Sequence, residues 1–293
     1  MLKLIVLSLL IISPASVGAE SVRHVLYQAE SIAPTNSPPT FDNGFLVVYS
    51  IGVATVYTRD GVLAYSIPVP DGHHIPYVAV DTDQTAAAAV NRGNSGGGIA
   101  IFDRRGSQIQ IIETGQYLPS FICFAPDHSI WTTGKHARRS LAEKPEFFIL
   151  RHFSRDGKEL GAFLPRSSFE DDGEPAADIV GRAYLRIANN RIGAFLRNAG
   201  NATKALWVEV DLNGKELGRW RTGDIDRQPV AFTPSGAVYA ERFGDISVLD
   251  HVTGKWNPVP IPSEGILLGA DGEALVFMAR GTPELRWVPL DTY

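Results

Sequence analysis

Apolar and polar residues alternate along most of the chain, in short runs separated by turn residues. Five segments have the form of a strand, a turn at a glycine and a returning strand, at 56–69, 99–112, 148–164, 206–220 and 246–261. Asp-Gly and Asn-Gly pairs occur in three of these turns, and they favour hairpins because the turn needs positive φ. The five turn glycines are 45, 51, 57 and 40 residues apart. This spacing is the length of a four-stranded propeller blade.

A second kind of hairpin alternates with the first and is found six times, at 39–50, 78–90, 120–134, 185–197, 229–241 and 267–279. A sixth copy of the first kind is missing. We expect its place to be taken by the two ends of the chain, with residues 285–291 pairing beside residues 21–30. Such a pairing would close the ring and remove the open edges of a linear array.

These repeats predict an all-β fold, a single six-bladed propeller domain of four-stranded antiparallel blades over residues 20–293. The four consecutive alanines within 83–90 occupy a hairpin position, so we assign them to a strand despite their weak β-propensity. Short helices are predicted in 135–146 and in part of 166–178. The aromatic residues Trp131, Phe195, Tyr239 and Phe277 recur in second strands and are predicted to lie in the core.

The segments FAPDHSIWTTG, FTPSGAVYAER and LGADGEALVFMA resemble the inner hairpins of six-bladed propellers of the broad NHL, gluconolactonase and TolB-like group. The resemblance covers nearly the whole chain after the leader and implies an architecture more than an activity. Gluconolactonase-like members hold a divalent metal on Glu, Asn and Asp, but the usual Glu-Gly-Pro entry is absent. Residues 129–133 echo a streptogramin-lyase repeat in one blade only. The resemblance therefore transfers no catalytic residue.

The first 19 residues predict a cleavable signal peptide. An apolar run at 4–12 follows Lys3, and small residues lead to Ala19. The run is too short to span a membrane, which takes about 20 apolar residues. The chain has one Cys, Cys123, far from the cleavage point, so the lipid attachment of bacterial lipoproteins has no acceptor. We expect an exported protein, periplasmic or secreted.

Composition and missing motifs exclude several kinds of binding and catalytic site. A net charge of −5 argues against binding of nucleic acid. A single Cys excludes an internal disulfide and a Cys-based zinc site, and the apolar neighbours of Cys123 favour a buried thiol. The chain lacks a phosphate loop, a serine nucleophile elbow and a zinc-type His-Glu pair, so no catalytic residue is predicted. Whether the protein is an enzyme stays open.

Basic residues gather at one set of strand ends. In a propeller the starts of first strands and the ends of second strands open on the same face. Seven cations fall at these places: Arg92, Lys135, Arg182, Arg197, Arg227, Arg242 and Arg280. They predict a basic channel mouth for a small anionic ligand, since guanidinium groups bind carboxylate and phosphate. The alternative is a solvated rim that discourages edge pairing.

Three histidines form a weaker candidate for a metal or acid-base site. His73 and His74 are adjacent, so in extended chain they point in opposite directions, and a metal would need a third ligand such as His136. No cofactor is predicted, and a divalent metal is left open. The overall hypothesis is a monomeric ligand-binding or protein-interaction module, with a lactonase-like or lyase-like enzyme as the alternative.

Overall fold

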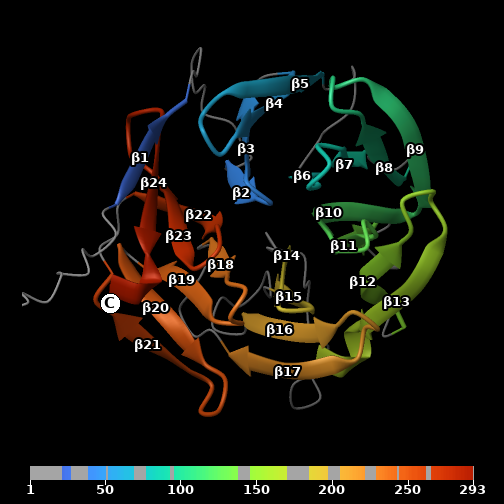
Figure 1. Ribbon diagram of the computed structural model, residues 1–293. Coiled ribbons are helices and arrows are strands. Elements are labelled where there is room, and N and C mark those ends of the chain that lie inside the picture. Colours follow the sequence, from blue (N-terminus) through green and yellow to red (C-terminus); the bar gives the residue numbers. More distant parts are fainter. Residues whose placement is uncertain are drawn as a thin grey trace, which may run out of the picture.

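The structure is a computed structural model. It describes residues 22–27, 39–50, 52–68, 77–92, 96–137, 146–169, 185–196, 205–221, 229–242, 244–261 and 265–292. Six four-stranded antiparallel sheets stand in a ring around a central axis (Figure 1). The predicted six-bladed propeller is confirmed.

Each blade is a pair of hairpins whose first strand lies at the axis. Blade 1 is β2 (Thr40–Asp42), β3 (Phe45–Ser50), β4 (Val53–Thr58) and β5 (Leu63–Pro68). Blade 2 is β6 (Val78–Val80), β7 (Ala86–Asn91), β8 (Gly97–Phe102) and β9 (Gln108–Gly115). Blade 3 is β10 (Tyr117–Phe124), β11 (Ile130–His136), β12 (Phe148–Phe153) and β13 (Glu159–Pro165). Blade 4 is β14 (Leu185–Ala188), β15 (Arg191–Leu196), β16 (Leu206–Asp211) and β17 (Glu216–Arg221). Blade 5 is β18 (Val230–Phe232), β19 (Val238–Arg242), β20 (Asp245–Asp250) and β21 (Lys255–Val259).

Blade 6 combines both ends of the chain, as predicted. It contains β22 (Ile266–Ala270), β23 (Ala274–Met278) and β24 (Glu284–Pro289), with β1 (Arg23–Leu26) as its outermost strand. Val25 is paired with Leu285 in this register, and the Tyr27 N–H donates to the Pro283 carbonyl at 2.9 Å. The N-terminal strand therefore closes the ring.

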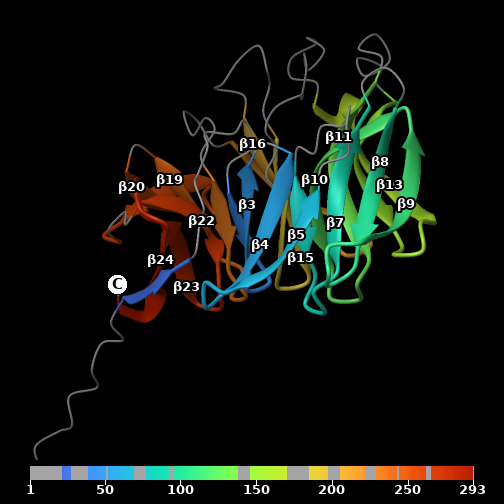
Figure 2. The same cartoon turned by 90° about the horizontal axis from the view of Figure 1, so that it is seen from above.

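The ring has two unlike faces, which Figure 2 shows from the side. The tight turns inside the hairpins lie along one face, the lower edge of Figure 2, and we call it the turn face. The starts of first strands and the ends of second strands lie on the other, which we call the loop face. In the described part of the chain, no helix is long and apolar enough to cross a membrane.

The alanine run forms strand β7, as predicted. All four alanines are fully buried, with Ala86 and Ala88 packed toward blade 1 and Ala87 and Ala89 packed on the opposite side. A second strand is covered on both faces by neighbouring blades, and the small side chain suits this close packing better than β-propensity alone would suggest.

The two predicted helices are described only in part. Lys135 and His136 belong to β11, so the first helix does not begin there, and residues 138–145 lie outside the described residues. In the second segment, Arg166–Phe169 forms a short 3-10 helix, η2, and the residues that follow it are not described.

The predicted core aromatics are largely confirmed. Trp131, Phe195 and Phe277 are fully buried, whereas Tyr239 is half-buried. The blade cores therefore depend on second-strand aromatics, as the repeat pattern indicated.

Enlarging Ala88 tests the packing between blades 1 and 2. We expect Ala88→Leu to lower the free energy of unfolding by about 1–3 kcal/mol, because the buried strand has no room for the added methylene groups. Urea unfolding measures it. Ala64→Leu, on the half-buried outer strand β5, is the control and should cost less; equal losses would contradict this account.

Candidate functional site

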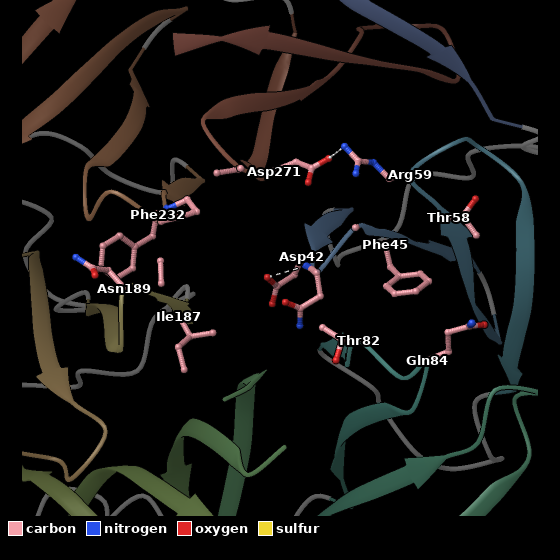
Figure 3. Close-up of a pocket in the computed structure, with 16 residues that line it drawn as sticks. Asp42, Phe45, Thr58, Arg59, Thr82, Gln84, Ile187, Asn189, Phe232 and Asp271 are labelled. Carbon is pink, nitrogen blue, oxygen red and sulfur yellow. Dashed lines mark hydrogen bonds and ion pairs between the residues drawn. The ribbon is translucent and has the colours of Figure 1, made fainter. Parts of the chain in front are cut away.

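The turn face contains a cavity of about 580 Å³, formed by inner-hairpin turns from five blades and by the outer-hairpin turn of blade 1 (Figure 3). Its wall is built of Asp42, Asn43, Gly44, Phe45, Thr58, Arg59, Thr82, Gln84, Ile187, Ala188, Asn189, Phe232, Pro234, Ala270, Asp271 and Gly272. A volume of this order is typical of small-molecule sites. The repeat pattern indicated a site on the loop face, and none of these cavity residues was among the predicted site residues.

Asp42 projects toward the middle of the cavity in Figure 3. Its Oδ1 accepts a hydrogen bond from the Asn43 N–H at 3.1 Å, and the Asn43 side-chain amide donates to the Val80 carbonyl of blade 2 at 2.9 Å. Burial raises the pKa of Asp42, and the nearby Asp81 adds to this, while Arg186 and the Asn43 N–H oppose it. A carboxyl in such a place favours the protonated form, which can donate a hydrogen bond.

An ion pair crosses the seam between blades 1 and 6 at the edge of the cavity. The Arg59 guanidinium lies 2.7 Å from Oδ2 of Asp271. The same oxygen accepts a hydrogen bond from the Trp287 indole N–H at 2.9 Å. Both charges are therefore neutralised by each other, and Asp271 is held by two groups.

Apolar side chains complete the wall. Phe45, Ile187 and Phe232 come from blades 1, 4 and 5 and stand among the polar turn residues. This combination of apolar surface with a few placed polar groups is the usual composition of a binding pocket.

A buried arginine lies directly beside the cavity. Arg186, on β14, precedes the cavity residue Ile187 and is only 4% exposed. Its guanidinium donates to the carbonyls of Val230 at 3.1 Å and Leu268 at 2.9 Å, and to the Tyr77 hydroxyl at 2.7 Å. These contacts join blade 4 to blades 5, 6 and 2. A signal was available in the sequence, since a cation in a short innermost strand is unusual.

The predicted basic mouth is described only in part. Arg92 forms an ion pair with Glu113, and Nη2 of Arg280 lies 3.6 Å from Oε1 of the buried Glu241. Lys135 is half-exposed on β11, and Arg242 ends β19, with its side chain not described. The remaining three cations, Arg182, Arg197 and Arg227, lie outside the described residues. The mouth stays a prediction, on the face opposite the cavity.

The histidine candidate is equally incomplete. His73 and His74 lie outside the described residues, and the ring of His136 is 6.1 Å from that of Phe147 in an edge arrangement. No group of three or more His, Cys, Asp or Glu side chains suited to a metal occurs among the described residues. Cys123 is fully buried, as predicted, and burial raises the pKa of its thiol well above the usual value.

Ser129, His152 and Asp127 form a hydrogen-bonded chain in blade 3. The Ser129 hydroxyl lies 2.6 Å from Oδ1 of Asp127 and 2.8 Å from Nε2 of His152, whose ring stacks on Trp131 at 4.1 Å. Burial lowers the pKa of His152, with Asp127 opposing. Ser129 is only 4% exposed, so this chain stabilises the blade rather than presenting a nucleophile.

The raised pKa of Asp42 predicts a pH effect on stability. The protonated Asp42 carboxyl stabilises the folded protein. This contribution is complete below the pKa of Asp42 in the unfolded chain, about 4, and is lost as pH rises through the raised pKa of Asp42 in the folded protein. Asp42→Asn removes this loss. The free energy of unfolding of the variant, relative to wild type, should therefore increase between about pH 4 and pH 7, by about 1.4 kcal/mol for each unit of pKa difference.

Urea unfolding across this pH range checks the prediction, and Asp83→Asn is the control. Burial acts to raise the pKa of Asp83, but hydrogen bonds from Thr85 and Arg155 outweigh it and lower the pKa. Its stabilising contribution is lost as pH falls, so the two variants should show opposite trends. A flat difference for Asp42→Asn would contradict the assignment.

No protein-family model matches this chain, and no curated protein matches it. Among solved structures it is similar to a gluconolactonase from Xanthomonas campestris, at 15% identity over 86% of this chain and 85% of that one, with a TM-score of 0.54. A protein of unknown function from Bacteroides caccae is similar at 13% identity over 77% of this chain and 78% of its own, with a TM-score of 0.50. At these identities the likeness shows the fold alone, a six-bladed propeller.

Proposed function

We propose that this protein is an exported ligand-binding propeller that takes up a small polar molecule in the turn-face cavity. The observation that carries the proposal is the cavity itself, where polar turn residues and apolar side chains from five blades surround one space. Tight turns on a closed ring hold these groups in place before a ligand arrives, which lowers the ordering cost of binding.

Charge favours a ligand without a strong net charge at this cavity. Arg59 and Asp271 neutralise each other, and burial raises the pKa of Asp42. The anionic ligand inferred from the sequence therefore belongs to the loop face.

Anion binding at the loop face is the second candidate function. Arg92, Lys135 and Arg280 stand at or within two residues of the ends of second strands, which lie on one face of the ring. Carboxylate or phosphate groups would bind such a set of cations in place of Glu113 at Arg92 and of Glu241 at Arg280. A protein carrying such groups is the alternative partner.

A hydrolase or lyase is the alternative in a different class. The Xanthomonas gluconolactonase is an enzyme of similar structure, but at 15% identity the similarity supports the architecture only. Enzyme action would appear as chemical conversion of a bound compound, whereas a binding module returns its ligand unchanged. Export, proposed from residues 1–19, is tested by the N-terminal sequence of the mature protein.

Filling the cavity tests the first candidate. Ligand-observed NMR with a library of small polar metabolites should identify binders of the wild-type protein. Ala188→Trp should abolish their signals because the indole occupies the cavity, with the fold retained. Val252→Trp adds the same side chain at a fully exposed turn and should bind as wild type. Binding that survives Ala188→Trp would place the ligand elsewhere.

Removing cations tests the second candidate. Replacing Arg92, Arg197 and Arg242 together by Gln should weaken binding of phosphates and polycarboxylates by at least about tenfold, because charge-assisted hydrogen bonds are lost. Titration calorimetry at low and high salt measures this, and wild-type affinity should fall with salt. Ligands of the turn-face cavity serve as the control. Unchanged binding of every anion would remove the hypothesis.

A further inference from the structure

Seven hairpin turns among the described residues share one geometry. Each places its fourth residue in the left-handed region and closes with a hydrogen bond from that residue's N–H to the carbonyl three residues earlier. In five of the seven that residue is glycine: Gly61, Gly106, Gly157, Gly214 and Gly236. In the other two it is Gln84, with φ of 69°, and His128, with φ of 65°. Glycine adopts this conformation without strain, whereas a side chain such as that of Gln does not.

The two exceptions differ in what their side chains contact. The His128 ring lies 2.7 Å from the Asp81 carboxylate, so its side chain links blades 2 and 3. The Gln84 side-chain amide has no hydrogen-bond partner among the described residues, and it lines the cavity. The contact with Asp81 therefore explains why His128 stands at a positive-φ position, whereas the Gln84 side chain has no such contact among the described residues.

Blade 4 repeats the pattern with a different turn. Asn189 and Asn190 both have positive φ, 50° and 55°. Asn189 lines the cavity and Asn190 does not. Within the described part of the chain, the Asn189 amide also has no hydrogen-bond partner. In Figure 3, Asn189 and Gln84 lie on opposite sides of Asp42.

The polar side chains of the cavity that have no hydrogen-bond partner among the described residues are uncharged. Gln84 and Asn189 offer amides, and Thr58 offers a hydroxyl; each of these groups both donates and accepts hydrogen bonds. The charges of Arg59 and Asp271 are already paired. Ligand hydroxyls match such groups, because a hydroxyl also donates and accepts. The apolar surfaces of Phe45 and Phe232 suit the carbon faces of a ring.

We propose that Gln84 and Asn189 are specificity-determining residues of the turn-face cavity, and that its ligand is a neutral polyhydroxylated molecule, such as a cyclic polyol or a saccharide. This inference rests on the proposed ligand-binding function. Gln84 stands at a strained turn position because it binds the ligand, not because the turn requires it, whereas Asn189 tolerates its turn and presents its amide to the same cavity.

Substitution by glycine separates the two roles. Gln84→Gly should leave the melting temperature unchanged or raise it by a few degrees, because strain is relieved, while ligand affinity falls about five- to tenfold. Asn189→Gly should behave likewise. Asn190→Gly is the matched control, a neighbouring positive-φ Asn outside the cavity, and should bind as wild type. Gln84→Asn, which keeps an amide and tolerates the turn, should restore part of the affinity.

The probes are methyl hexosides, inositols and maltotriose, with glucuronate and glucosamine as charged analogues, measured by NMR and calorimetry on the full chain. Binding of neutral probes at least tenfold tighter than of the charged ones supports the proposal. Tighter binding of maltotriose than of methyl hexosides would indicate an oligosaccharide ligand, and the reverse would indicate a single sugar unit. Preference for either charged analogue, or Gln84→Gly binding as wild type, overturns it. Binders of another class that Ala188→Trp excludes would overturn it while leaving the ligand-binding function standing. Failure of every compound to bind the cavity would overturn both.

Discussion

The buried Arg186 guanidinium is the contact on which the centre of the ring depends. Six first strands converge on the axis, and two of them, β18 and β22, direct carbonyls toward this side chain. Burial of a charge costs several kcal/mol unless its donors are satisfied, and here they reach two carbonyls and the Tyr77 hydroxyl. Arginine suits the position because its planar fork presents five fixed donors, which lysine cannot do. The attraction of this cation for Asp42 opposes the effect of burial on that carboxyl, so the axis and the cavity share one electrostatic environment.

Around this centre, polar contacts cross the seams between blades on the turn face. Asn43 reaches Val80 across blades 1 and 2, and His128 reaches Asp81 across blades 2 and 3. The closing seam is a chain of contacts. Arg23 of β1 lies over the Trp287 ring at 4.9 Å, and the Trp287 indole holds Asp271 for its ion pair with Arg59. The strand that closes the ring is thereby connected to the cavity wall. A rigid wall follows from closure, because no blade can shift without breaking contacts to both neighbours.

The sequence could predict the fold because its signals are local. Alternation with period 2 and glycine at the turns identify each hairpin, and six copies at regular spacing leave few architectures besides a propeller. The cavity could not be predicted in the same way, because Asp42 and Asn189 are far apart in the chain and meet only when the ring closes. Arg186 stands in LRIA, where period-2 alternation accommodates a polar residue, so the pattern alone does not distinguish it from a solvent-facing side chain; only its place in an innermost strand is unusual. Gln84 has no sequence signal of its own, and only its φ value shows that it departs from what the turn prefers.

The two faces differ in how firmly they can hold a ligand. A hairpin turn of four or five residues is fixed at both ends by its ladder, and Gln84 is further held by the Tyr65 hydroxyl, which donates to its carbonyl at 2.9 Å. The same constraint restricts turn residues to those that tolerate positive φ, and Asn is among the few with a side chain that binds hydroxyls. Loop-face connections carry no such restriction in length or composition, since the spacing between repeats varies from 40 to 57 residues. A preorganised site for one small polar molecule therefore fits the turn face, whereas the loop face is free to vary in length and sequence.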